Sequence, residues 1–271
     1  MRASLMNGAG NRFILVDIRG QDAPRAPTVE QLRAFADRHP YDQFLLLEDA
    51  PDADAFMRIW NCDGEEVGAC GNGTRAAAWA MMRREPADEV SIDTQGGLLR
   101  ARPASQFVIS VDMGKPRLGW AEIPLARESD TVELAFTAIA GGVQVERPGA
   151  VNMGNPHAVF FVRDAESIPL AELGPEIEND PMFPEKVNAS FAEIIDGDHI
   201  RLRVWERGAG ITAACGTAAC ATLVAAHRRG LIGRSASIHA DGGDLHIEWR
   251  QDDHVILTGP VEDDGEIEID F

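Results

Sequence analysis

The sequence is poor in basic residues, and lysine is almost absent. It has 25 lysines and arginines against 44 acidic residues, for a formal net charge of −19, and its only lysines are Lys115 and Lys186. A chain this acidic repels the phosphate backbone and anionic lipid head groups alike. Nucleic acid and membrane surfaces are therefore poor partners, and a small molecule is the expected one.

Long apolar runs are also missing. The longest weakly polar stretch, residues 211–226, is shorter than the roughly 20 residues that cross a bilayer, and it is rich in alanine and threonine. The opening MRASLMNGAGNRFILVD lacks the unbroken apolar segment of a signal peptide. We expect a cytoplasmic protein in which residues 211–226 form a buried helix.

Cysteine is scarce, and its spacing does not suggest a metal. The four cysteines are Cys62, Cys70, Cys215 and Cys220, which match neither paired C-x2-C motifs nor a Cys2His2 pattern. Neither lysine lies in a phosphate-binding glycine loop, and no G-x-G-x-x-G or Walker motif occurs. We therefore expect no metal and no cofactor, and cysteines that are thiols in a reducing compartment.

What the sequence does contain is an internal duplication. RIWN at 58–61 is answered by RVWE at 203–206, and ACG at 69–71 by ACG at 214–216, each 145 positions later. The dipeptide GN before an apolar run occurs at position 10 and again at position 154. SIDTQGG at position 91 likewise corresponds to SIHADGG at position 237. Four landmarks in one order and at nearly one spacing indicate two repeats rather than chance matches.

Each repeat has the pattern of a mixed α/β domain. FILVD, FLLLE and AVFFV are typical of buried strands, and an Ala-rich run with basic residues at its end follows each ACG and indicates a helix, the second closed by Gly230. We predict an α/β (α+β) fold of two pseudo-symmetric domains. Residues 1–115 form the first domain, to which a strand near 263–271 returns, and residues 116–262 form the second.

Cys70 and Cys215 are equivalent positions, each directly before a glycine and a helix start. Unpaired N–H groups at a helix N-terminus favour a thiolate, so we expect a lowered thiol pKa at both. Inversion of a stereocentre needs a base on one face and an acid on the other, which a pair of cysteines can supply across a cleft between the domains. Cys62 and Cys220 have no cysteine at the equivalent position and are interpreted as structural.

Five motifs together resemble the diaminopimelate epimerase family. They are GNRFILVD, YDQFLLLE, NCDGEEVGACGNGTR, VNMGNPHAVFFV and RVWERGAGITAACGTAACA, in family order from Gly10 to about Ala221. The resemblance implies a cofactor-independent epimerase that interconverts LL- and meso-2,6-diaminopimelate, a diamino dicarboxylate, for lysine and peptidoglycan synthesis. It also implies two α/β domains, each with a sheet wrapped around a central helix, and a homodimer.

The resemblance further implies roles for individual residues. Cys70 and Cys215 would be the catalytic pair, and His157 and Glu206 would tune their protonation. The remaining implied residues would bind substrate: Asn11, Gln43, Asn61, Gly71, Asn72, Asn155, Asn188, Glu206, Arg207, Gly216 and Thr217. Arg12, Ala76 and Ile211 depart from the family pattern, in which the first motif usually reads Gly-Asn-Asp, a cysteine follows TR, and GxGET precedes the second catalytic cysteine.

Three alternatives stay open. A proline racemase or hydroxyproline epimerase of the same fold would also use two cysteines, but its substrate has no distal amino acid end for Glu206 and Arg207 to bind. A relative of the phenazine-biosynthesis isomerases would lack the cysteine pair. A binding protein with a vestigial site would keep the fold and could keep the cleft.

Overall fold

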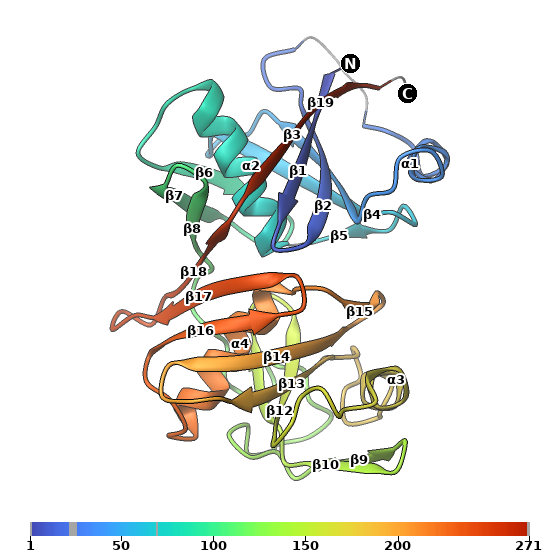
Figure 1. The fold of residues 1–271 in the computed structure, drawn as a ribbon, viewed down its shortest axis with the longest axis vertical. Helices are drawn as coiled ribbons and strands as arrows, with labels where there is room; N and C mark the ends of the chain where they lie inside the picture. Colours follow the sequence, from blue (N-terminus) through green and yellow to red (C-terminus); the bar gives the residue numbers. More distant parts are fainter. Residues whose placement is uncertain (1, 22–25, 69, 270–271) are drawn as a thin grey trace. The chain divides into compact units, whose positions relative to one another are not determined.

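The computed structural model describes residues 2–21, 26–68 and 70–269, so Ala69 of the first ACG motif and residues 270–271 of the expected final strand lie outside the described residues. The chain packs into two compact units (Figure 1). Unit 1 comprises Met1–Asp112 and Thr258–Phe271, and unit 2 comprises Met113–Leu257.

Unit 1 contains two helices among its described residues, α1 (Val29–Ala36) and α2 (Gly71–Arg84). Its strands are β1 (Arg2–Gly8), β2 (Asn11–Asp17), β3 (Gln43–Glu48), β4 (Ala55–Asn61), β5 (Glu66–Val67), β6 (Val90–Asp93), β7 (Leu99–Ser105), β8 (Val108–Asp112) and β19 (Glu262–Glu268). The C-terminal β19 pairs antiparallel with β1, so the two ends of the chain complete one sheet.

Unit 2 also contains two helices, α3 (Leu170–Glu178) and α4 (Gly216–Arg228). Its strands are β9 (Thr137–Ala140), β10 (Val143–Glu146), β11 (Gly149–Asn152), β12 (Pro156–Val162), β13 (Asn188–Ile194), β14 (His199–Glu206), β15 (Gly210–Thr212), β16 (Ser235–Ala240) and β17 (Gly243–Trp249). Strand β18 (Val255–Pro260) runs from unit 2 into unit 1.

The two units repeat one connectivity. In unit 1, β2 and β3 are parallel through α1, β3 and β4 antiparallel, and β4 and β6 parallel through α2. In unit 2, β12 and β13 are parallel through α3, β13 and β14 antiparallel, and β14 and β16 parallel through α4. The β9–β10 hairpin of unit 2 forms a separate two-stranded sheet. The predicted mixed α/β class is confirmed.

Helices α2 and α4 are the central helices of the two units. Helix α2 contacts strands β1, β2, β3, β6, β7 and β8, and α4 contacts β11, β12, β13, β16 and β17. Every residue from Gly216 to Ala226 is buried, and so are most residues of α2. A helix buried on all sides needs small apolar residues so that strands can approach it closely, which explains the alanine-rich runs. Both helices were predicted from those runs, and both are confirmed.

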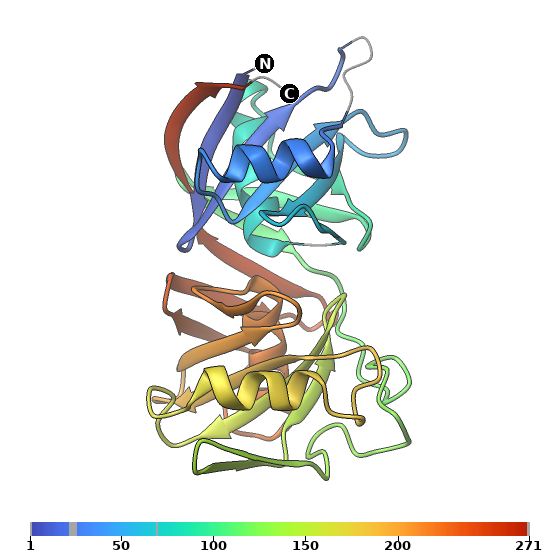
Figure 2. The same ribbon diagram turned by 90° about the vertical axis from the view of Figure 1, so that its right-hand side faces the viewer.

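The other two helices lie on the outer side of their sheets (Figure 2). Helix α1 begins with a capping box at Thr28 and buries Leu32 and Phe35 in a cluster with strand residues of unit 1. Helix α3 buries Leu173 and Ile177 in the largely aliphatic and phenylalanine-rich core of unit 2. Among the described residues, no helix is long and apolar enough to span a bilayer.

Candidate active site

Cys70 is the N-cap of α2, the residue that connects an extended segment to the helix. Its backbone is extended (φ −149°, ψ 108°), and its Sγ accepts the N–H of Gly73 at 3.2 Å. A Cβ at Gly73 would lie 3.4 Å from this sulfur and 3.1 Å from Leu45, so the glycine leaves room around the thiol. The Cys70 side chain is partly exposed.

Amide side chains surround the start of α2. The Nδ2 of Asn72 donates to the Oδ1 of Asn11 at 2.6 Å, and the Oδ1 of Asn72 accepts from the fully buried Arg75 at 2.8 Å. Asn11 begins β2 directly after the tight turn at Ala9 and Gly10, whose φ values are +53° and +83°. The turn and the buried arginine therefore hold Asn11 and Asn72 in place beside Cys70.

Gln43 and Asn61 form a second polar pair in unit 1. They are partners in the antiparallel register of β3 and β4, and the Nε2 of Gln43 donates to the Oδ1 of Asn61 at 3.0 Å. Asn61 ends β4 at the position that Glu206 occupies at the end of β14 in the second repeat. The strands thus fix the direction of both side chains.

Cys215 is the N-cap of α4, with a similarly extended backbone (φ −127°, ψ 113°). Unlike Cys70 it is buried, and its Sγ lies 3.4 Å from the Oγ1 of Thr217. Burial, followed by the charge of Glu206, raises the pKa of the Cys215 thiol well above its ordinary value, despite hydrogen bonds that favour the thiolate. The expected lowering of the thiol pKa is therefore wrong for Cys215, because desolvation outweighs the helix N-terminus.

Glu206 lies at the end of β14 and interacts with both Thr212 and Cys215. Its Oε1 accepts from the Oγ1 of Thr212 at 2.5 Å. Burial raises the pKa of the Glu206 carboxyl, and the hydrogen bonds from Thr212 and Cys215 oppose that shift. The thiol and the carboxyl form a coupled pair, in which a charge on either one disfavours a charge on the other.

His157 is fully buried on β12, and its Nε2 lies 2.8 Å from the Oδ1 of Asn155. Burial, with a smaller contribution from the charge of Arg207, lowers the pKa of His157 to about 3. The imidazole is therefore neutral near pH 7. Its Nδ1 has no hydrogen-bond partner among the residues that the structure describes.

Asn188 connects the neighbouring strand to the hairpin that carries Glu206 and Arg207. Its Nδ2 donates to the carbonyl of Pro156 at 2.8 Å, and its Oδ1 accepts the backbone N–H of Arg207 at 2.9 Å. The side chain of Arg207 is exposed and donates to the carbonyl of Glu185 at 3.0 Å. The guanidinium thus lies where a dissolved anion can reach it.

The candidate residues fall into two groups, one in each unit. Around the start of α2 lie Cys70, Gly71, Asn72 and Asn11, with Gln43 and Asn61 on strands β3 and β4. Around the start of α4 lie Cys215, Gly216, Thr217 and Glu206, with His157, Asn155, Asn188 and Arg207 linked through β12 and β13. That both groups bind one substrate stays a prediction.

The three departures from the family pattern lie in different surroundings. Arg12 is exposed, and its backbone N–H donates to Asp42 at 2.7 Å, so the motif's backbone is held by a carboxylate from elsewhere in the chain. Ala76 is fully buried within α2, and Ile211 is half exposed on β15. Two contributors were missed by the sequence analysis. They are Arg75, which holds Asn72, and Thr212, which holds Glu206.

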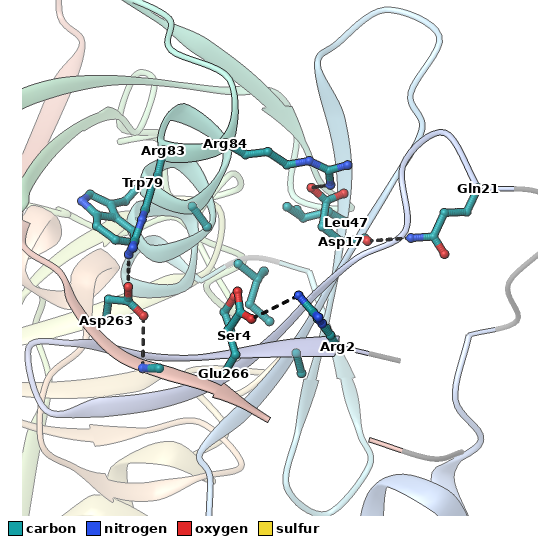
Figure 3. A pocket seen from close by; sticks show the side chains of 14 residues that line it. Arg2, Ser4, Asp17, Gln21, Leu47, Trp79, Arg83, Arg84, Asp263 and Glu266 are labelled. Atoms are coloured by element: carbon teal, nitrogen blue, oxygen red, sulfur yellow. Dashed lines mark hydrogen bonds and ion pairs between the residues drawn. The ribbon is translucent and has the colours of Figure 1, made fainter. Parts of the chain in front are cut away.

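A separate pocket of about 840 Å³ lies in unit 1 at the C-terminal end of α2 (Figure 3). Leu15 and Leu47 line it together with Trp79, and charged pairs such as Arg84 with Asp17 and Arg83 with Asp263 surround it. Cys70 lies at the opposite end of this helix, about 20 Å away along its axis. None of the candidate catalytic or binding residues lines the pocket.

Solved structures of proteins described as a proline racemase, epimerases and phenazine biosynthesis proteins share this fold. A probable proline racemase from Agrobacterium radiobacter K84 aligns with a TM-score of 0.72 at 18% identity, covering 100% of this chain and 93% of that one. A predicted epimerase from Pseudomonas aeruginosa aligns with a TM-score of 0.71 at 18% identity, covering 99% and 98%. At these identities the likeness establishes the fold.

Sequence comparison then narrows the class to one family. The model of the diaminopimelate epimerase family matches residues 3–119 and 149–263. Diaminopimelate epimerases from Phenylobacterium zucineum and Rhodospirillum centenum are 54% and 51% identical, each over 94% of this chain and over 93% and 88% of their own lengths. The chain belongs to the diaminopimelate epimerase family and is an isomerase, as the five motifs predicted.

Proposed function

We propose that this protein interconverts LL- and meso-2,6-diaminopimelate without a cofactor, using Cys70 and Cys215 as the two acid–base groups. The observation that carries the proposal is the placement of these cysteines. Each is the N-cap of the central helix of a unit, and the two units share one connectivity. The family's name and the relatives at 47–54% identity support the choice of substrate.

The reaction moves one proton off the α-carbon and another onto its opposite face. A thiolate takes the α-proton, the electron pair stays on carbon next to the carboxylate, and the second thiol donates a proton from the other side. Each turnover leaves the cysteines with exchanged protonation states, so the same pair serves both directions. Backbone N–H groups at Gly71, Asn72, Gly216 and Thr217 would stabilise the carboxylate while negative charge develops beside it.

The resting protonation of the pair follows from the surroundings of Cys215. Because burial and Glu206 favour its neutral form, Cys215 rests as the thiol and Cys70 supplies the first thiolate. Neutral His157 and the Glu206 carboxyl then tune the energy of charging Cys215 during turnover. Under this assignment, Cys70 removes the α-proton from the stereoisomer that binds when Cys70 is the thiolate and Cys215 is the thiol.

The second end of the substrate accounts for the remaining polar residues. Diaminopimelate carries a distal carboxylate and ammonium, for which Arg207 and Glu206 offer a cation and an anion. Asn11, Gln43, Asn61, Asn155 and Asn188 would bind the other polar groups. The two repeat domains, the homodimer and a cytoplasmic role in lysine and peptidoglycan synthesis belong to the same proposal, and light scattering would test the dimer.

A racemase or epimerase acting on proline or hydroxyproline is the alternative, favoured by the fold shared with the proline racemase. The two proposals differ in the substrate that exchanges its α-proton. In deuterated solvent we expect deuterium at the α-carbon of LL-diaminopimelate and none in L-proline or trans-4-hydroxy-L-proline. Exchange into a proline substrate alone would overturn the substrate, and exchange into none of the three would overturn the enzymatic proposal.

A further inference from the structure

Helix α3 contacts the hairpin of β14 and β15 through one face. Gly174 and Glu178 are four residues apart, so they lie one above the other on the same side of the helix. Both meet Trp205, the residue before Glu206. A Cβ at Gly174 would lie 2.3 Å from the indole, and the indole N–H donates to the Oε2 of Glu178 at 2.7 Å.

Glu178 also holds the turn of that hairpin. Its Oε1 accepts the backbone N–H of Gly208 at 3.1 Å and lies 3.2 Å from the Nζ of Lys186. Gly208 has a φ of +77°, a left-handed conformation that a non-glycine residue rarely adopts. Glu178 is 5% exposed, and three donors compensate the cost of burying its charge.

The residues held by Glu178 flank Glu206 and Arg207 on both sides. Trp205 precedes the pair, and Gly208 follows it. Glu178 therefore acts together with Asn188, which accepts the N–H of Arg207, in holding the hairpin backbone near Glu206, the residue that interacts with Cys215. Burial acts to raise the pKa of the Glu178 carboxyl, but the hydrogen bonds from Trp205, Lys186 and Gly208 outweigh it and lower that pKa.

In the first repeat, the equivalent helix α1 also contacts the equivalent hairpin, that of β4 and β5. In unit 1, Arg33 of α1 donates to the carbonyl of Asp63 at 2.6 Å in the turn after Asn61. A Cβ at Gly64 would lie 2.6 Å from Val29 of the same helix. In both repeats the first helix thus contacts the turn that follows a candidate site residue. Arg33 of α1 binds the turn after Asn61 in unit 1, and Glu178 of α3 binds the turn after Glu206 and Arg207 in unit 2.

We propose that Glu178 is a positioning residue, which fixes the hairpin of β14 and β15 so that Glu206 meets Cys215 and Arg207 faces the substrate. The inference rests on the proposed function for the substrate contacts, whereas the contact between Glu206 and Cys215 is a property of the free protein. Glu178 itself touches neither reacting atoms nor substrate in this assignment.

The test uses Glu178→Gln, with Glu176→Gln as the matched control on the same helix, where Glu176 is exposed. Iodoacetamide alkylation of Cys215, followed by peptide mass spectrometry over a range of pH, reports the apparent pKa of this thiol without any substrate. If the hairpin moves, Glu206 leaves Cys215 and the apparent pKa falls toward its ordinary value. In the Glu206→Gln background, Glu178→Gln should then change the profile no further.

Kinetics with diaminopimelate give the second measurement. We expect kcat/KM to fall about tenfold in Glu178→Gln, within the range for residues in one hydrogen-bond network, mainly through KM. Trp205→Phe, which removes only the indole donor, should shift both measurements in the same direction by less, and it decides the matter should Glu178→Gln fail to fold.

Two results would overturn the inference. One is a folded Glu178→Gln protein whose Cys215 profile and KM match those of Glu176→Gln. The other is a change in the Cys215 profile that persists undiminished in the Glu206→Gln background. If the protein proves inactive on diaminopimelate, the alkylation measurement still tests the positioning role, so failure of the proposed function is distinguishable from failure of this inference.

Discussion

In unit 1 the Cys70 thiol is partly exposed, accepts an N–H from Gly73 and has amide side chains near the same helix start. In unit 2 the Cys215 thiol is buried, close to Thr217 and coupled to the Glu206 carboxyl. The backbone around the two thiols is alike, since both residues are extended N-caps of central helices. The shared backbone places each thiol at a helix start, whereas burial and the nearby Glu206 favour the neutral form of Cys215.

The positions one turn further along the helices differ in the same way. Arg75, fully buried in α2, holds Asn72. The equivalent residue of α4, 145 positions later, is the buried Cys220. In unit 1 a buried cation, Arg75, lies on the central helix. In unit 2 the titratable groups near the thiol, Glu206 and His157, lie on the surrounding strands. A duplicated scaffold can therefore give two equivalent thiols unlike electrostatic surroundings.

The largest expected effect comes from removing either thiol. We expect Cys70→Ser and Cys215→Ser each to lower kcat about 10²–10⁴-fold, because a serine hydroxyl is a poor base and a poor acid at neutral pH. Separation of the stereoisomers on a chiral column, in both directions, measures the loss. Cys62→Ser is the control, since Cys62 is exposed and absent from the proposed site. Parental rates in either catalytic variant would remove the two-base mechanism from both units.

The next effect separates the units by their response to acid. His157 is fully buried, and its pKa is lowered to about 3. Below about pH 6.5 its imidazole is therefore protonated in the unfolded chain but stays neutral in the folded chain. The contribution of His157 to the stability of unit 2 should therefore become less favourable as the pH drops below about 6.5, by on the order of 1 kcal/mol per pH unit, and should not change with pH above it. The only histidine of unit 1, His39, is exposed.

Amide hydrogen exchange measures this acid response, because it reports the opening of each unit separately. We expect the protection of unit 2 to decline between pH 6.5 and pH 5 in the parent and to decline less in His157→Gln, which can still hydrogen-bond Asn155. His39→Gln is the matched control and should leave the decline unchanged. An equal decline in the parent and in His157→Gln would show that the buried imidazole does not weaken unit 2.

Much of the scaffold was predictable from the sequence, because its signals are local and occur twice. The alanine-rich runs after Gly71 and Gly216 indicated buried helices, and the apolar segments at 13–17, 44–48 and 158–162 indicated strands, all of which the structure contains. The β9–β10 hairpin was not predicted. Among the described residues, unit 1 contains no such separate two-stranded sheet, so the duplication offered no second copy to compare.

The chemistry of the candidate site was less predictable, because its contacts join residues far apart in the chain. The helix start predicted a lowered thiol pKa at Cys215, but burial and the charge of Glu206 reverse that direction. Likewise Glu178 and Trp205 are 27 residues apart, and each alone is typical of an ordinary helix or strand. Local pattern locates a thiol at a helix N-terminus, whereas its protonation depends on side chains that only folding brings near.

The smallest expected effect tests that protonation directly. Burial and, after it, the charge of Glu206 raise the pKa of Cys215, and Glu206→Gln removes the second cause, so the thiol should ionise at lower pH and react faster with iodoacetamide at pH 8. Reaction of Cys70, in the other unit, should change less. Glu248→Gln, at an exposed position of β17, is the control. If both cysteines kept their parental rates, the charge of Glu206 would not account for the difference between the two thiols, and burial alone would have to explain it.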